Sequence, residues 1–338
     1  MVTEATFQYS HTIGFLANQG RGFNNPVDLA RDSTGLLYVL NRAGPELGIR
    51  LPYKRVTICT VDEEYLGEFS TGGTDDGELW WPSSLAFDSQ DTLFVSDEAL
   101  NRISSFNREG QFLGRWGVAG SGDGQLDRPS YIACDAEDNL LVADSLNCRI
   151  QKFTREGKFL SSWGARGNGP GQFNLPWGIG FDASFNVYVA DWRNDRIQKF
   201  DAAGSYLAQW GGTDTSGPFN RPAAVAVDAE GNLYVADWGN ERVLALDQEG
   251  RLLAELRGDS IDSTWVQDYF AANPEEGAAR YEADLEPKIG PRPEFNREES
   301  ANVEKLLWGP TSVQVDSSGR IYIVDSCLHR VQVYQKLG

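Results

Sequence analysis

Short apolar runs separated by turn-forming residues recur along most of the chain. Within residues 129–163, such runs cover 131–134, 140–143, 149–153 and 159–163, and the segments between them carry Asp, Asn or a Glu-Gly pair. Short runs rich in β-branched and aromatic residues, bounded by turns of this kind, are typical of strands. The pattern therefore predicts four short antiparallel strands in this stretch.

This four-strand unit is repeated along the chain. Each copy opens at a proline, and the clear copies begin 47, 47 and 46 residues apart. The clear copies open at Pro82, Pro129, Pro176 and Pro222, and two divergent copies open at Pro26 and Pro310. A four-stranded unit with a period in this range is typical of a propeller blade. We therefore expect an all-β fold, a six-bladed β-propeller that occupies residues 1–338 as a single domain.

The two ends of the chain are expected to meet in the sixth blade. Residues 9–13, followed by Gly14, align with the fourth strand of another copy at 159–163, whereas the copy at 310–334 has three strands. An N-terminal strand that pairs with the last blade covers an edge that would otherwise stay open. We therefore predict that this strand closes blade six.

Three polar positions recur in the copies, and we interpret them as structural. The Asp six residues after each proline is expected to cap its turn, and the Arg that opens the third strand is expected to pair with the Asp that ends the second. The first set is Asp32, Asp88, Asp135, Asp182, Asp228 and Asp316. The pairing sets are Arg55, Arg102, Arg149, Arg196, Arg242 and Arg330, with Asn41, Asp97, Asp144, Asp191, Asp237 and Asp325. Function is therefore sought where the copies differ.

The repeated segments resemble a known family. NLYVADWGNERV (Asn232–Val243), NVYVADWRNDRI and NLLVADSLNCRI resemble the NHL repeat, and the resemblance covers nearly the whole chain outside residues 259–307. Members include RNA-binding and ubiquitin-ligase-linked modules, a peptide-amidating lyase that needs several channel histidines, and many bacterial propellers without an assigned activity, which this chain resembles. Similar six-bladed folds include gluconolactonase-like and strictosidine-synthase-like enzymes. The resemblance implies the propeller and leaves the function open.

Composition narrows the classes of partner. The formal net charge is −19, which disfavours nucleic acid and anionic membranes because both are polyanions. The chain lacks an apolar run long enough for a transmembrane helix and a basic, apolar start typical of a signal peptide. Its four cysteines are far apart, which favours reduced thiols. We therefore expect a cytoplasmic protein, monomeric or weakly oligomeric.

The length differences between copies fall on one face, here called the insertion-bearing face. This face carries the loops between strands two and three and the connections between blades. The first copy has a longer loop at 43–54, and residues 259–307 form a long insertion before the last copy. We expect one helix that is capped by Asp262 or Ser263 and stopped by Pro274, and a second from about Glu298 to Leu307. The insertion is either a lid over the channel mouth or a clamp on blades five and six.

Aromatic residues beside the loops of this face, and polar residues unique to single blades, are the candidates for ligand binding. Trp177, Trp192, Trp238 and Tyr131 are expected to line an aromatic cup for a small organic ligand or a peptide side chain. The polar candidates at the same mouth are Asp28, Glu98, Arg42 and Arg193. The two carboxylates suit a divalent cation, or they pair with the two arginines, which we favour. Apart from such a cation, no cofactor is expected.

One further cluster suits a metal or a nucleophile. His11, Cys327 and His329 are all expected in blade six, which recommends them as zinc ligands or a thiol–imidazole pair, although no third strong partner is evident. The leading hypothesis is a cytoplasmic NHL-like propeller that binds a small molecule or a protein segment on its insertion-bearing face. The alternative is a hydrolase or lyase with a carboxylate or metal site at the channel mouth.

Overall fold

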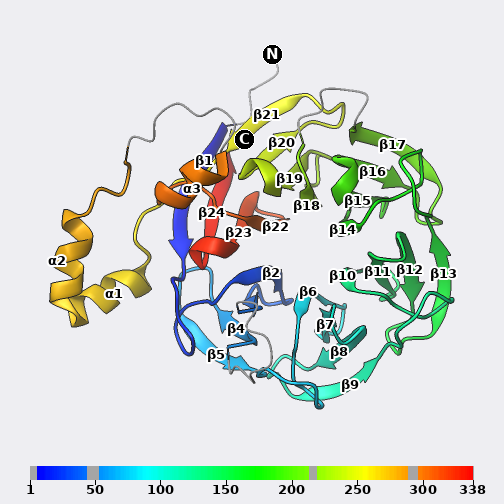
Figure 1. Ribbon diagram of the computed structural model, residues 1–338, viewed down its shortest axis with the longest axis horizontal. Helices are drawn as coiled ribbons and strands as arrows, with labels where there is room; N and C mark the ends of the chain where they lie inside the picture. Colours follow the sequence, from blue (N-terminus) through cyan, green and yellow to red (C-terminus); the bar gives the residue numbers. More distant parts are fainter. Residues whose placement is uncertain (1–5, 44–52, 213–218, 288–295, 338) are drawn as a thin grey trace.

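Six four-stranded antiparallel sheets surround a central axis in the computed structural model (Figure 1). The structure describes residues 6–43, 53–212, 219–287 and 296–337. In each blade the first strand lies nearest the axis and the fourth at the rim (Figure 1). The predicted six-bladed propeller is therefore confirmed, although residues 44–52 of the long first-blade loop lie outside the described residues.

The strands begin and end at the residues that the repeat marks, with a proline opening the first strand of each blade and an arginine opening the third. Blade one is β2 (Pro26–Arg31), β3 (Leu37–Asn41), β4 (Arg55–Cys59) and β5 (Tyr65–Phe69). Blade two is β6 (Pro82–Phe87), β7 (Leu93–Asp97), β8 (Arg102–Phe106) and β9 (Phe112–Trp116). Blade three is β10 (Pro129–Cys134), β11 (Leu140–Asp144), β12 (Arg149–Phe153) and β13 (Phe159–Trp163). Blade four is β14 (Pro176–Phe181), β15 (Val187–Asp191), β16 (Arg196–Phe200) and β17 (Tyr206–Gly211). Blade five is β18 (Pro222–Val227), β19 (Leu233–Asp237), β20 (Arg242–Leu246) and β21 (Leu252–Leu256).

Blade six joins the two ends of the chain. It contains β22 (Pro310–Val315), β23 (Arg320–Asp325), β24 (Arg330–Leu337) and the N-terminal strand β1 (Thr6–Ile13). β1 pairs antiparallel with β24 from Thr6 opposite Leu337 to Ile13 opposite Val331. The predicted closure by the N-terminal strand is confirmed.

A polar side chain at the end of each second strand holds the loop that leads into the same blade. In all six blades, the backbone N–H two residues before the opening proline donates to this side chain at 2.6–2.8 Å. The acceptors are Asn41, Asp97, Asp144, Asp191, Asp237 and Asp325. We call this contact the lead-in bond. The repeated acid is therefore a structural residue, as the sequence suggested.

The repeated arginines also fasten these loops. In blades three to six, the arginine Nε lies 2.8–2.9 Å from the carboxylate that accepts the lead-in bond. Arg102 of blade two differs, because its guanidinium donates to the carbonyls of Thr74, Asp75 and Glu78. Arg55 of blade one likewise donates to loop carbonyls and pairs with Glu68 at 2.7 Å. The predicted Asp–Arg pair thus forms in four blades, and the arginine binds loop carbonyls instead in the other two.

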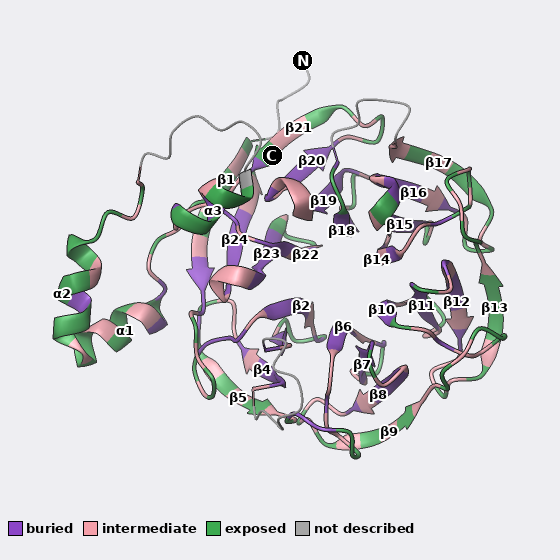
Figure 2. Cartoon of the chain, viewed as in Figure 1, coloured by how far each residue is buried: buried purple, intermediate pink, exposed green. Residues whose placement is uncertain are grey.

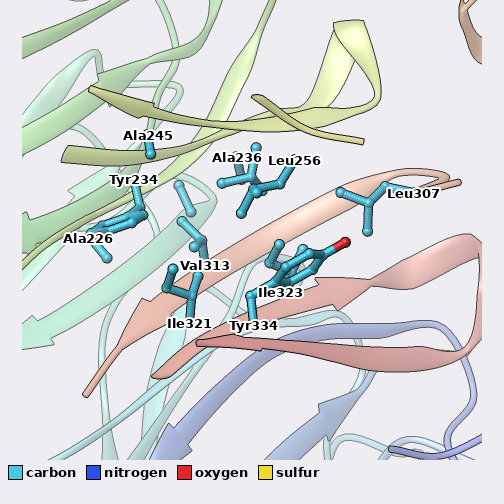
Figure 3. Close-up of a cluster of buried hydrophobic side chains, with 12 residues drawn as sticks. Ala226, Tyr234, Ala236, Ala245, Leu256, Leu307, Val313, Ile321, Ile323 and Tyr334 are labelled. Carbon is cyan, nitrogen blue, oxygen red and sulfur yellow. The ribbon is translucent and has the colours of Figure 1, made fainter. Parts of the chain in front are cut away.

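The hydrophobic core lies between neighbouring blades. Burial is concentrated in the strands nearest the axis, and the outer strands alternate between half-buried and exposed positions (Figure 2). Figure 3 shows one such cluster, in which Ala236 and Leu256 of blade five pack with Val313 and Ile323 of blade six. Outer-strand aromatics extend this packing: Trp116 lies against Gly157 of the next blade, where an added Cβ would fall 2.4 Å from the ring.

The insertion forms three helices whose boundaries differ from those expected. They are α1 (Thr264–Ala272), α2 (Pro274–Glu282) and α3 (Asn296–Asn302), and residues 288–295 lie outside the described residues. Ser263 caps α1 by accepting the N–H of Val266 at 3.2 Å. Pro274 opens α2, because a proline in the first helical position lacks only an N–H that would stay unpaired anyway. The expected extension of the last helix to Leu307 was wrong, since the Leu307 N–H donates to the Arg257 carbonyl of the blade-five connection at 2.7 Å.

α1 and α2 lie outside the ring, beside blades six and one rather than over the axis (Figure 1). Trp265 of α1 is 3% exposed and packs against Phe23 and Tyr65, with ring centroids 5.9 and 6.4 Å apart. Thr264 donates its N–H and its hydroxyl to the carboxylate of Glu63. α1 therefore braces the seam where blade six meets blade one, whereas α3 contacts blade five, since Arg297 pairs with Glu241 at 2.8 Å. Among the described residues, no helix is both long and apolar enough to span a membrane.

Deleting residues 1–13 should destabilise the whole propeller, because the outer edge of β24 would lose its partner. We expect the midpoint of thermal unfolding to fall by roughly 10 °C, equivalent to a few kcal/mol for a chain of this size. A matched deletion of residues 1–5 leaves β1 in place and should unfold like the full chain. Equal midpoints for both deletions would contradict this role of β1.

Replacing Trp265 with alanine should detach α1 from the seam. Loss of a large buried side chain lowers the free energy of unfolding by about 3 kcal/mol. Tyr281→Ala removes an aromatic side chain of α2 that is 66% exposed, and it should have little effect. Both variants are compared by chemical denaturation, and equal midpoints would show that the brace does not stabilise the ring.

Candidate functional site

A cavity of about 340 Å³ opens on the insertion-bearing face. Most of its lining comes from three positions of the repeat, all adjacent to the lead-in bond. Asn25 and Trp81 directly precede an opening proline. Val27, Trp177, Ala223 and Thr311 directly follow one, and Arg42, Trp192, Trp238 and Ser326 follow the residue that accepts the bond. Ala43 and Lys54 complete the lining. We call this cavity the tryptophan cup.

Three tryptophans form one wall of the cup. Trp177 lies on β14, Trp192 begins the short helix η1 (Trp192–Asn194), and Trp238 begins η2 (Trp238–Asn240). The ring centroids of Trp177 and Trp192 are 5.9 Å apart, and those of Trp192 and Trp238 are 6.2 Å apart. The rings therefore form a continuous arc across blades four and five. The structure brings together the three tryptophans that the sequence marked.

Basic side chains on blade one line the opposite wall. The Arg42 guanidinium carbon lies 4.4 Å from the centroid of Trp81, and its Nη1 lies 3.2 Å from Oε1 of Glu98. Lys54 is 5% exposed, and its Nζ donates to the Trp80 carbonyl at 2.5 Å. Burial lowers the pKa of both basic groups and raises the pKa of Glu98. The expected pairing of Glu98 with an arginine is therefore seen, and Arg42 is its partner.

Asp28 lies beneath the cup, not at its rim as expected. β2 carries it one residue deeper along the axis than Val27, and its carboxylate is fully buried. The hydroxyls of Ser84 and Ser312 donate to it at 2.7 and 2.6 Å, and the N–H groups of Leu29 and Leu85 donate as well. Four donors thus occupy both oxygens in place of the expected arginine. Burial raises the pKa of Asp28 to about 6.

Tyr131 also lies below the cup. It is 4% exposed, and its hydroxyl accepts a hydrogen bond from Gln314 Nε2 at 3.2 Å, which links blade three to blade six. It lines a second hollow of about 330 Å³ between the inner strands. Asp28 and Tyr131 therefore belong to the layer beneath the cup, and neither is among the residues that line it.

Sequence reasoning missed several basic residues around the cup. Lys54 ends a loop that aligns with nothing in the other blades, so the repeat gave no signal for it. Arg221 stands directly before Pro222, the position that Trp81 occupies in blade two, and its guanidinium carbon lies 5.1 Å from the Trp192 centroid. Arg193, which was expected at the mouth, lies 5.7 Å from the same centroid.

The three histidine and cysteine candidates do not form one cluster. Nε2 of His11 donates to the Val61 carbonyl at 2.8 Å, whereas Nδ1 of His329 accepts the N–H of Asn25 at 2.9 Å. Burial lowers the pKa of His329 and raises the pKa of Cys327 to about 11. Over the described ranges, no group of three or more His, Cys, Asp or Glu side chains is placed to hold a metal ion. The expected cluster failed because the two imidazoles serve backbone groups on different loops.

Comparison with known proteins agrees with the repeat. The model of the NHL repeat matches residues 219–251 and 307–334, which belong to blades five and six. The chain is a six-bladed β-propeller, and two of its blades match the NHL repeat. No curated protein matches its sequence significantly.

Solved structures show how widely this propeller fold is shared. A virginiamycin B lyase from Staphylococcus aureus, solved with quinupristin, is 13% identical, with 99% of this chain and 100% of that chain covered and a TM-score of 0.57. A Bacteroides thetaiotaomicron protein of unknown function is 16% identical over 99% and 77%, with a TM-score of 0.63. A putative gluconolactonase is 11% identical over 98% of each chain, with a TM-score of 0.59. At these sequence identities, the similarity between this chain and the three solved structures concerns the fold alone.

Asp28→Asn should change how stability depends on pH. Because the folded protein raises the pKa of Asp28, its contribution to stability is complete only well below the ordinary pKa of 3.8 and is lost as pH rises through about 6. Between pH 4 and pH 7.5, the free energy of unfolding of the native protein should fall by about 2 kcal/mol relative to the variant. Denaturant titrations at both pH values test this, with the exposed Asp62→Asn as control. If the native protein and Asp28→Asn differ in free energy of unfolding by the same amount at both pH values, the raised pKa of Asp28 is contradicted.

Proposed function

We propose that this NHL-repeat propeller is a binding protein that holds a small organic molecule, or the side chain of a protein segment, in the tryptophan cup. The observation that carries the proposal is the arc of Trp177, Trp192 and Trp238. Flat, rigid rings on a fixed scaffold present a large apolar surface that loses little conformational entropy on binding. A ring of the ligand that lies along this arc contacts several indoles at once.

The position and size of the cup also support binding. Its volume of about 340 Å³ is at the lower end of the range for small-molecule sites. The rings are set by the lead-in bonds of a rigid ring of blades, and loops on such a scaffold often carry function. The site is therefore preorganised for a ligand of about the size of a bicyclic aromatic group.

Hydrolase or lyase activity is the alternative. The names of two structural neighbours, a virginiamycin B lyase and a putative gluconolactonase, favour it only through a shared fold. The lining includes four tryptophans, whereas its described members include no carboxylate, imidazole or thiol. This composition supports binding rather than acid–base or metal chemistry. No cofactor is part of the proposal.

The proposal also covers the location, the oligomeric state and the partner of the protein. We propose a cytoplasmic protein, monomeric or weakly oligomeric, whose partner is the cup ligand. A net charge of −19 supports a partner other than nucleic acid or an anionic membrane, because either polyanion would meet repulsion over most of the surface.

Trp192→Ala tests the arc, because Trp192 is the central ring and contacts both neighbours. Naphthalene-2-carboxamide, a neutral flat probe, is titrated into the protein by calorimetry. We expect binding by the native protein and a loss of at least roughly tenfold in affinity for the variant, the effect of one stacked ring. Phe185→Ala, on a turn between strands one and two of blade four, is the control. Equal affinities in all three proteins would overturn the cup as the binding site.

A further inference from the structure

Among the described residues, five basic side chains surround the tryptophan cup. Arg42 and Lys54 line it directly. The guanidinium carbons of Arg193 and Arg221 lie 5.7 and 5.1 Å from the centroid of Trp192, and that of Arg297 from α3 lies 4.7 Å from the centroid of Trp238. These five come from blades one, four and five and from the insertion, which otherwise share no motif. The cup therefore concentrates positive charge in a protein whose net charge is −19.

Described acids neutralise two of the five. Glu98 pairs with Arg42 at 3.2 Å, and Glu241 pairs with Arg297 at 2.8 Å. Within the described part of the chain, Lys54, Arg193 and Arg221 form no ion pair within 4.0 Å. Lys54 donates to a carbonyl, and the carboxylate of Asp97 acts on it only from beyond that distance. A buried ammonium without an anion in contact gains from a partner that supplies one. The cup thus presents an excess of cations beside an aromatic wall.

The charge also decides against a cationic ligand. An arc of tryptophans alone is typical of sites for quaternary ammonium groups, because the ring faces attract cations. Here arginines already lie over Trp192, Trp238 and Trp81. An incoming cation would compete with them for the ring faces and would meet repulsion from Lys54. An anion meets attraction from the same basic groups instead of repulsion.

From these observations we propose that the ligand of the cup is a flat aromatic anion, with its ring along the tryptophan arc and its carboxylate towards Lys54. The inference rests on the proposed function of the cup and adds the charge of its ligand. Such a group is supplied either by a free aromatic acid or by a peptide that ends in an aromatic residue with a free carboxylate. The shared chemistry is one ring and one negative charge, within a volume of about 340 Å³.

Three probes of nearly equal shape test the charge on the native protein by calorimetry. They are naphthalene-2-carboxylate, naphthalene-2-carboxamide and 2-naphthylmethylammonium. We expect the carboxylate to bind at least about tenfold tighter than the carboxamide, since a charge-assisted contact is stronger than a neutral one, and the ammonium to bind weakest. If the carboxamide binds as tightly as the carboxylate, or the ammonium binds best, the inference is overturned while the cup remains a binding site. If none of the three binds, both proposals fail.

The variant Lys54→Met tests whether Lys54 is the residue that recognises the negative charge of the ligand. We expect it to abolish the preference for carboxylate over carboxamide, because the affinity for carboxylate should fall far more than the affinity for carboxamide. Arg221→Met, at an exposed residue, should reduce the preference by a smaller factor and keeps the test valid if Lys54→Met does not fold. Lys158→Met removes an exposed lysine on a turn between strands three and four and is the matched charge control. If Lys54→Met and Arg221→Met both keep the full preference for carboxylate over carboxamide, these residues do not recognise the charge and the inference about them is overturned.

The two sources of the carboxylate are separated with the peptide Gly-Gly-Phe and its C-terminal amide. Binding of the acid peptide at an affinity similar to that of naphthalene-2-carboxylate, with loss in the amide, supports a protein or peptide C-terminus as the ligand. Binding of naphthalene-2-carboxylate alone supports a free aromatic acid. Tighter binding of the amide would contradict the role of negative charge.

Discussion

The lead-in bond is the contact on which the rest of the structure depends. In each blade, the polar side chain that ends strand two accepts the N–H two residues before the opening proline, and this acceptor is fully buried in every blade. A hydrogen bond to a charged acceptor contributes about 1.5–3 kcal/mol, and an unmet buried carboxylate is more costly still. The bond fixes the residues on either side of the proline and the residue after the acceptor. Those three positions supply ten of the twelve lining residues of the tryptophan cup, so one structural contact sets both the fold and the geometry of the site.

Ring closure is a second constraint, because blades six and one must join through contacts distant in sequence. β1 pairs with β24 at the outer edge, and Trp265 of the insertion packs on Phe23 at the flank. At the axis, Asp28 of blade one accepts hydroxyl hydrogen bonds from Ser312 of blade six and Ser84 of blade two. The three contacts lie at different distances from the axis. Together they hold blades six and one together at the rim, at the flank and near the axis. The cup lies on the insertion-bearing face of the ring that these contacts close.

The repeat predicted the fold because its period, its prolines and its arginines coincide with strand boundaries in all six blades. It also found Trp177, Trp192 and Trp238, since these large aromatic residues stand at repeat positions next to the loops of the insertion-bearing face. It failed for Asp28, because alignment gives the register of a residue and not its depth along the axis. It gave no signal for Lys54, which follows a loop without counterparts. The first helix does stop before Pro274, as expected, but the helix that Pro274 opens was missed: a proline can end one helix and begin the next, and whether a second helix follows depends on contacts that the local sequence does not contain.

Net charge and local charge answer different questions about partners. Charges further apart than about 8 Å are largely screened at physiological salt. A small ligand inside the cup is therefore governed by the basic groups around it, such as Arg42, Lys54 and Arg221, which lie on or against its walls. A polyanion docking on the same face would extend well beyond the cup and meet the surface of a protein with a net charge of −19. The acidic surface, which we expect to repel nucleic acid, is thus compatible with the proposed small anion, and it would add selectivity for anions small enough to be surrounded by the cup.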